Sequence, residues 1–164
     1  MLVDEQDRPL GDATRETCHT LPGHMHRAFA ILLFTPAGEL LLCQRSAAKA
    51  LWPLVWDGSV ASHPRLGESY DEACRRALGA ELGLEVSLSR VGHIVYRAPY
   101  GERGVEHEYC ALFRGTVEAP VVPNPAEVAA WRTLDLAALR RAIAAEPASY
   151  SPWLALALQH PAFR

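Results

Sequence analysis

The chain has 164 residues, of which 49% are hydrophobic. This length supports one well-packed core, so we expect a single domain over residues 1–164. The net charge is −3 and the 16 lysines and arginines are scattered, which argues against a nucleic-acid partner. The longest apolar run, residues 28–34, is too short to span a bilayer, so we expect no membrane association.

The four cysteines are not arranged as C-x-x-C pairs. Their spacing favours reduced thiols over a disulfide framework, and we therefore expect a cytoplasmic protein. We also expect a monomer whose partner is a small molecule.

The first third of the chain contains two predicted strands. Residues 1–18 are polar and can begin with a short strand, whereas residues 28–34 and 39–45 are apolar runs separated by a Thr-Pro-Ala-Gly turn. This pattern predicts a β-hairpin. Proline and glycine interrupt residues 51–60, which predicts a loop that leads into a short strand.

A helix is predicted between Ser69 and Gly83. Ser69 and Glu72 form an S-x-x-E capping box, and Gly83 is typical of a helix C-terminus. Glu72 is also spaced to pair with Arg76 on the wet face. At about 100° per residue, Glu81 lies on the apolar face. A carboxylate there is unusual unless it is paired, bound to a metal, or extended to solvent along its aliphatic stem.

The second half of the chain predicts a further hairpin and more helices. Residues 86–97 and 105–117 are strand-like runs around a Pro-Tyr-Gly turn, and residues 128–132 form another candidate strand. Residues 136–145 and 153–160 are predicted helices. Together these elements indicate an α+β fold.

Several histidines and glutamates have spacings that could bring them to one site. Glu106 and Glu108 are two residues apart in a predicted strand, so they project from one face and repel each other. A divalent cation would remove this conflict. His19, His26 and His63 lie near the predicted hairpin and helix, and mixed imidazole and carboxylate ligands suit Mn²⁺, Zn²⁺ or Mg²⁺.

Taken singly, each histidine is more often an ordinary surface or core residue than a ligand. This is our interpretation of the other four histidines: His24, His93, His107 and His160.

The helical region resembles part of the Nudix box, the loop-helix signature of enzymes that bind diphosphates through magnesium. The similar residues are Gly67, Glu68, Arg76 and the segment 81–84. The chain departs from the hydrolase pattern at three positions: Ser62 replaces a glycine, and Ala77 and Ala80 replace metal-binding glutamates. Ordinary Nudix hydrolysis is therefore disfavoured.

The chain is more similar to type 1 isopentenyl-diphosphate delta-isomerase, a branch of the Nudix superfamily. The similarity extends from near residue 15 to residue 153. It lies in six stretches: residues 19–29, 44–56, 59–68, 96–98, 106–113 and 151–153. The resemblance implies a Nudix-like mixed β-sheet core between helices.

The resemblance also implies two metal sites. In that family three histidines and two glutamates hold one divalent ion, and the counterparts here are His19, His26, His63, Glu106 and Glu108. Glu81 matches the glutamate that holds Mg²⁺ on the substrate diphosphate, together with the main-chain carbonyl at the position of Ala61.

Three basic residues match positions that receive the diphosphate: Arg15, Arg45 and Lys49. Charge-assisted contacts to phosphate oxygens suit such residues. A further arginine of the family is replaced by Ala77, which implies a reduced affinity for the diphosphate.

The implied reaction moves a double bond through a tertiary carbocation. Glu108, accompanied by Tyr96, resembles the residue that protonates the alkene, and Trp153 resembles the aromatic residue that stabilises the cation. The family's second proton-transfer group is a cysteine, and Ala61 occupies its position. An alanine cannot exchange a proton, although Ser59 or Ser62 could substitute weakly.

Three functions therefore remain open. The first is an isopentenyl-diphosphate isomerase whose activity is impaired by Ala61. The second is a divergent enzyme that acts on a prenyl or other small diphosphate, by hydrolysis or by other carbocation chemistry. The third is a silent diphosphate-binding protein.

Overall fold

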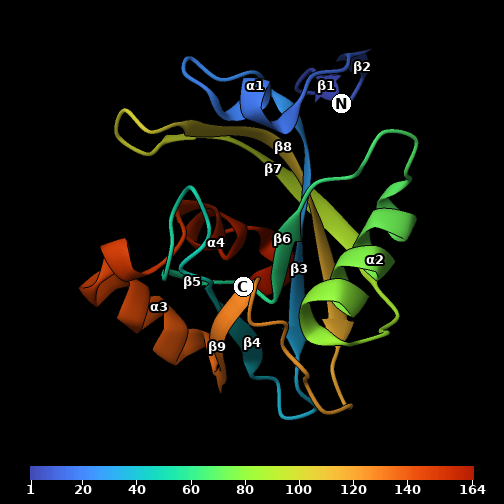
Figure 1. Cartoon of the computed structure of the whole chain (residues 1–164). Helices are drawn as coiled ribbons and strands as arrows, with labels where there is room; N and C mark the ends of the chain where they lie inside the picture. Colours follow the sequence, from blue (N-terminus) through green and yellow to red (C-terminus); the bar gives the residue numbers. More distant parts are fainter.

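Strand β3 (His26–Phe34) is the centre of the fold, because it pairs with strands on both of its edges. This computed structural model describes residues 1–164. In it, β3 runs parallel to β8 (Val105–Thr116), and β8 pairs antiparallel with β7 (Ser89–Pro99) (Figure 1). The predicted hairpin in this region is confirmed, although its first strand begins at Ser89 rather than at residue 86.

The predicted hairpin of residues 28–45 is confirmed only at its turn. Strand β4 (Leu40–Arg45) pairs with β3 at a single position, Phe34 opposite Leu40, and then diverges from it. Along its length β4 pairs instead with β9 (Val128–Leu134). The predicted pairing along the whole length of the two strands is wrong. An apolar run indicates that a strand exists, but it does not identify the strand that pairs with it.

A short segment fills the gap between β3 and β4. Strand β5 (Trp56–Asp57) pairs with β4, and strand β6 (Val60–Ser62) pairs with β3. Between them, the hydroxyl of Ser59 donates to Leu41 O at 2.7 Å and accepts from Leu33 N at 2.8 Å. The buried Ser59 therefore joins the two strands at the point where they separate.

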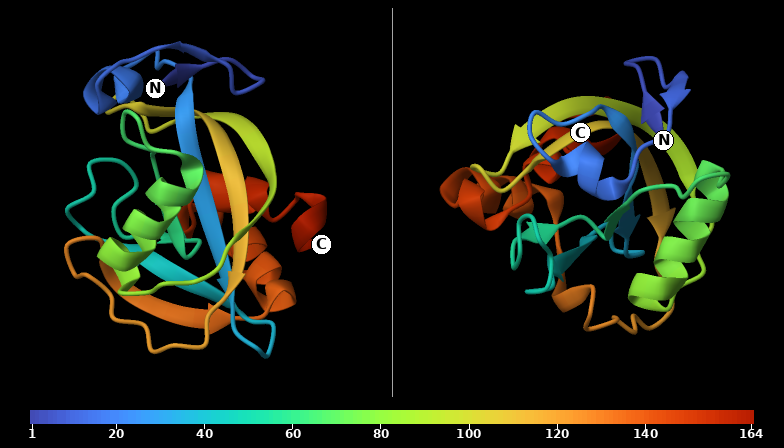
Figure 2. Two further views of the ribbon diagram at one scale, coloured as in Figure 1. Left: turned by 90° about the vertical axis from the view of Figure 1, so that its right-hand side faces the viewer. Right: turned by 45° about the horizontal axis from the view of Figure 1, so that its top comes forward.

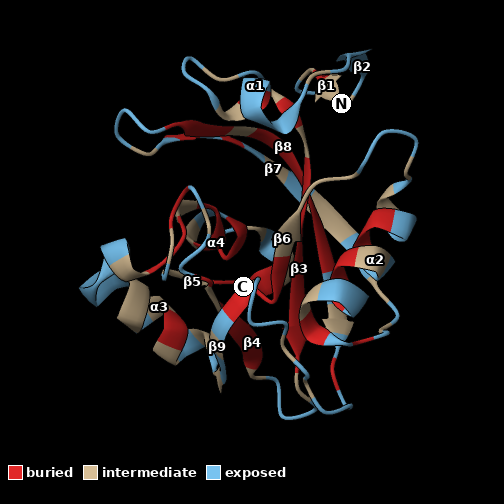
Figure 3. Ribbon diagram, viewed as in Figure 1, coloured by how far each residue is buried: buried red, intermediate tan, exposed pale blue.

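Helices cover both faces of the sheet, as two further views show (Figure 2). Helix α2 (Tyr70–Leu82) packs on the face that carries Phe29, Ile31 and Leu33. Helices α3 (Leu136–Ala145) and α4 (Pro152–Ala157) pack on the opposite face. Because successive side chains of a strand alternate between faces, β3 is buried on both sides (Figure 3). The predicted α+β Nudix-like fold, a mixed sheet between helices, is confirmed.

Helix α2 has the predicted caps. Ser69 and Glu72 form the reciprocal capping box, and Gly83 adopts φ +65° at the C-terminus. The predicted pair between Glu72 and Arg76 is wrong, because Glu72 is used by the cap. Arg76 instead donates to both carboxylate oxygens of Glu68, at 2.7 and 2.8 Å.

The N-terminal region forms two short strands and one helix. The strands are β1 (Leu2–Val3) and β2 (Pro9–Gly11), and the helix is α1 (Arg15–His19). The sequence did not predict α1, which has only five residues and is capped by the side chain of Thr14.

At the other end of the chain, α3 has the predicted bounds and α4 ends at Ala157, before residue 160. Two 3₁₀ turns, η1 (Pro147–Ser149) and η2 (Pro161–Phe163), flank α4. No helix is both long and apolar enough to cross a bilayer.

The role of Ser59 can be tested by substitution. We expect Ser59→Ala to lower the free energy of unfolding by about 1–3 kcal/mol, because Leu33 N and Leu41 O lose a buried partner. Ser62→Ala, three residues away, should change it by less than about 0.5 kcal/mol. Urea denaturation followed by circular dichroism measures both, and equal small effects would contradict a bridging role for Ser59.

Candidate active site and metal centre

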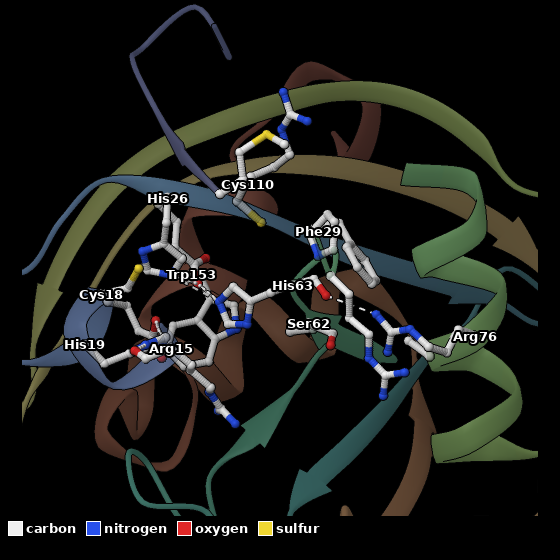
Figure 4. A pocket seen from close by; sticks show the side chains of 18 of the residues that line it. Arg15, Cys18, His19, His26, Phe29, Ser62, His63, Arg76, Cys110 and Trp153 are labelled. Atoms are coloured by element: carbon white, nitrogen blue, oxygen red, sulfur yellow. Dashed lines mark hydrogen bonds and ion pairs between the residues drawn. The ribbon is translucent and has the colours of Figure 1, made fainter. Parts of the chain in front are cut away.

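Three histidines and two glutamates meet in the structure, and their ligand atoms all lie within 4.8 Å of one another. The close-up shows the three imidazoles gathered beside Trp153 (Figure 4). Their ring centroids are separated by 4.8 Å, 4.9 Å and 5.3 Å. The members are His19, His26, His63, Glu106 and Glu108; we call them the His/Glu cluster.

Strand pairing explains how distant residues meet. His26 begins β3 and lies opposite Glu108 in the parallel register with β8. Tyr96 lies opposite Glu108 on the other side, in β7. The short helix α1 adds His19, and the end of β6 leads directly to His63. The central sheet therefore holds the carboxylates rigidly, and connecting segments bring the other ligands to them.

Backbone carbonyls orient two of the imidazoles. Nδ1 of His19 lies 2.6 Å from Arg15 O, and Nδ1 of His26 lies 2.8 Å from His24 O. A carbonyl can only accept, so each Nδ1 carries a proton and each ring points its Nε2 into the cluster.

These Nε2 atoms face carboxylate oxygens. His19 Nε2 lies 2.8 Å from Glu106 Oε2. The angles do not make this contact a hydrogen bond, so both atoms are buried without a hydrogen-bond partner. A buried imidazole nitrogen and a carboxylate oxygen that face each other without a hydrogen bond can be joined by a cation between them. The donor set and its spacing therefore fit a divalent metal ion with nitrogen and oxygen ligands.

Burial keeps two of the imidazoles neutral. It lowers the pKa of His26 and of His63 to about 3. A neutral imidazole has the free lone pair that a metal ligand needs.

Glu108 stands between a tyrosine and a histidine. Tyr96 donates its hydroxyl to Glu108 Oε2 at 2.5 Å, and His63 Nε2 lies 2.9 Å from Glu108 Oε1. Burial raises the pKa of Glu108 and raises that of Tyr96 well above its usual value. The site thus favours a protonated Tyr96 and brings a proton within reach of Glu108.

A cavity of about 610 Å³ opens over the cluster, a size suited to a small-molecule ligand. The candidate catalytic, substrate-binding and metal-binding residues all line it. Besides the five cluster members they are Arg15, Arg45, Lys49, Ala61, Glu81, Tyr96 and Trp153.

The three basic residues differ in their availability. Arg15 is exposed and forms no ion pair. Lys49 pairs with Glu127, and Arg45 donates to Trp52 O and Leu51 O, both at 2.9 Å. Of these three, Arg15 is therefore the unpaired cation at the cavity, whereas Arg45 is held by the loop that follows it.

Glu81 lies half-buried near the end of α2, on the side of the cavity. Burial raises its pKa to about 7. The two cations near it are already paired, Lys49 with Glu127 and Arg45 with Asp57. Glu81 therefore keeps carboxylate oxygens that a cation could use.

Ala61 lies on the cavity wall and has no side-chain group that can carry a proton. It pairs with Ala30 of β3. Ser59 cannot replace a thiol there, because the residue is only 1% exposed and its hydroxyl joins β3 to β4. Ser62 does line the cavity, as do the buried thiols of Cys18 and Cys110.

Sequence reasoning named Arg76 and Glu68 as part of the Nudix-box pattern but missed the way they support the site. Arg76 donates to His63 O at 3.1 Å while it pairs with Glu68, and this fixes the backbone that carries the ligand. The two residues belong to the Nudix-box pattern, which is the signal that could have linked them. Asp57 was also missed, and no spacing in the sequence marks it as buried.

Comparisons with known proteins agree with this architecture. The NUDIX domain model matches residues 24–154. The chain is 44% identical to isopentenyl-diphosphate Delta-isomerase of Nocardia farcinica, over 96% of this chain and 91% of that protein. It is 39% identical to the protein of the same name from Klebsiella pneumoniae subsp. pneumoniae, over 95% and 86% of the two chains.

Solved structures show the same fold. The crystal structure of DR0079 from Deinococcus radiodurans matches with a TM-score of 0.79 at 26% identity, over 96% of this chain and 95% of that one. MutT protein from Methanosarcina mazei Go1 matches with a TM-score of 0.63 at 19% identity, over 77% and 85% of the two chains, and supports the fold alone. From its domain match and its curated relatives, the chain belongs to the Nudix superfamily, in the group of proteins named isopentenyl-diphosphate Delta-isomerase.

Proposed function

We propose that the chain is an isopentenyl-diphosphate delta-isomerase, which converts isopentenyl diphosphate to dimethylallyl diphosphate. The observation that carries this proposal is the position of Glu108. Its carboxylate lies between Tyr96 and the three histidines, at a cavity that Trp153 also lines. This arrangement suits the protonation of a carbon–carbon double bond better than the activation of water on a diphosphate.

The reaction adds one proton to the terminal alkene carbon and removes another from the allylic carbon. Glu108 gives the first proton, and Tyr96, 2.5 Å away, hydrogen-bonds to the carboxylate and can share the proton with it. The positive charge then develops on the tertiary carbon. The indole of Trp153 offers a π-face to that charge.

The metal sites belong to the same proposal. The His/Glu cluster would hold Mn²⁺, Zn²⁺ or Mg²⁺, and Glu81 with the carbonyl of Ala61 would hold a Mg²⁺ ion. When bound, these ions supply positive charge that balances the clustered carboxylates and the substrate diphosphate. Arg15 binds the diphosphate directly, and Lys49 does so after it releases Glu127. Arg45 lines the same end of the cavity.

The site lacks the family's group for the second proton transfer. Removal of a proton needs a base across the substrate from Glu108, and the methyl group of Ala61 cannot act as one. Loss of one positioned acid or base typically slows a reaction by about 10²- to 10⁴-fold. Ala61 therefore favours the two alternatives that accept the same diphosphate without completing the isomerisation. These are a divergent enzyme and a binding protein.

Restoring the thiol tests the function directly. We expect the metal-loaded protein in D₂O to convert isopentenyl diphosphate slowly into deuterated dimethylallyl diphosphate, and Ala61→Cys to raise the rate by about 10²-fold or more. Mass spectrometry of the product measures both. Absence of product and of deuterium exchange in the Ala61→Cys variant would contradict the isomerase function, and release of phosphate or pyrophosphate would favour hydrolysis.

Removal of the Tyr96 hydroxyl tests the proton donor. In the Ala61→Cys background, we expect Tyr96→Phe to lower kcat by about 10²-fold, because Glu108 loses its proton partner. The metal content, measured by inductively coupled plasma mass spectrometry, should stay the same because Tyr96 is not a ligand. An unchanged kcat would remove Tyr96 from the mechanism.

A matched pair of variants distinguishes the two metal sites. We expect Glu106→Gln to weaken binding of the first ion at least about tenfold, with or without inorganic pyrophosphate. Glu81→Gln should leave that ion in place and abolish only the additional Mg²⁺ that binds together with pyrophosphate. Isothermal titration calorimetry measures both, and identical behaviour of the two variants would contradict separate sites.

A further inference from the structure

Asp57 is a buried carboxylate that contacts residues of the cavity wall without lining the cavity itself. Only 5% of it is exposed. Oδ1 accepts from the Ser151 hydroxyl at 2.7 Å and from Gly58 N at 2.7 Å, and Oδ2 accepts from Trp153 Nε1 at 2.9 Å. Arg45 Nη1 lies 3.7 Å from Oδ2. Asp57 thus meets four groups, and one of them is the indole that faces the cavity.

The contact with Arg45 extends this network to the loop after β4. Arg45 donates to the carbonyls of Leu51 and Trp52, both at 2.9 Å. Trp52 has φ +47°, a left-handed conformation that a bulky residue rarely adopts unless its surroundings hold it. The guanidinium therefore holds this loop in a conformation that the loop would not adopt alone.

The loop held by Arg45 places Trp52 against Trp153. The ring of Trp52 lies edge-on to that of Trp153, with centroids 5.2 Å apart. The ring of Tyr96, the partner of Glu108, is stacked on that of Trp153, with centroids 6.1 Å apart and an angle of 27° between the ring planes. The orientation of Trp153 is thus set by its N–H bond to Asp57, by Arg45, whose guanidinium lies 5.3 Å from the ring centroid, by Trp52, which the same network holds, and by Tyr96, which is bonded to Glu108.

We propose that Asp57 is a positioning residue for the reaction: it fixes the indole of Trp153 through the Nε1 hydrogen bond and, through Arg45, the loop that packs Trp52 against that indole. This role rests on the proposed function, because it gives the indole the task of facing a developing cation. Asp57 does not touch the substrate and acts only through Trp153 and Arg45.

The chemistry of this contact suits a cationic reaction. An indole N–H that donates to a carboxylate is polarised, so the ring face becomes more negative and attracts a cation more strongly. Trp153 also leaves its N–H without any other partner in the chain. If Asp57 were neutral, the ring would lose both the polarisation and part of its orientation.

Substitution by an amide separates charge and orientation from bulk. In the Ala61→Cys background, we expect Asp57→Asn to lower kcat by about 10-fold with a change of less than about threefold in KM for isopentenyl diphosphate. Asp135→Asn, which changes the N-cap of α3 away from the site, is the matched control and should leave both constants unchanged. An unchanged kcat in a folded Asp57→Asn protein would overturn the proposal.

A double-mutant cycle tests whether Asp57 acts through the indole. Trp153→Phe keeps an aromatic ring but has no N–H. We therefore expect the double variant to have a kcat less than about threefold below that of Trp153→Phe alone. Full additivity of the two losses would overturn action through Trp153 and indicate a general structural role.

A spectroscopic measurement keeps this test separate from the proposed function. In ¹⁵N-labelled protein, the Nε1–H resonance of Trp153, identified by its absence in Trp153→Phe, should lie downfield of the other tryptophans and be protected from solvent exchange. Asp57→Asn should shift it upfield. If the Ala61→Cys protein is inactive but this resonance behaves as expected, the proposed function fails while the positioning of Trp153 stands. A Trp153 resonance that exchanges freely in the unmodified protein would overturn the positioning, even if Asp57→Asn does not fold.

Discussion

The burial of two carboxylates beside three imidazoles is the constraint on which the site depends. Glu106 and Glu108 are 6% and 5% exposed, and the facing atoms of His19 and Glu106 have no hydrogen-bond partner. Such a group of acceptors is unfavourable in a protein interior unless a cation joins them. The surrounding structure holds it together nonetheless, because β3 and β8 run side by side and set His26 opposite Glu108.

The segment between β4 and α2 connects this centre to the rest of the cavity. Residues 56–62 pair first with β4 and then with β3, and Ser59 joins the two strands. This segment places Asp57 within hydrogen-bond distance of Trp153 Nε1 and Ala61 on the cavity wall, and it leads to His63. One insertion into the sheet therefore positions a metal ligand, the site of the missing thiol and the support for the aromatic wall.

The sequence predicted the helix of Glu81 and the strands β7 and β8 because their signals are local. The caps of α2 and the alternation around Glu106 and Glu108 lie within a few residues. Strand pairing depends on distant residues, so the separation of β3 from β4 was not predicted. The resemblance to a family supplied the ligand set, which spacing alone left open. Neither approach identified Asp57, whose importance arises only when β5 and α4 meet.

We expect the five residues of the His/Glu cluster to form one metal centre. X-ray absorption spectroscopy of the Zn²⁺-loaded protein tests it most directly. We expect nitrogen and oxygen ligands at about 2.1 Å, with multiple scattering that corresponds to three imidazoles and with no sulfur. A spectrum that fits thiolate ligands, or fewer than three imidazoles, would contradict it.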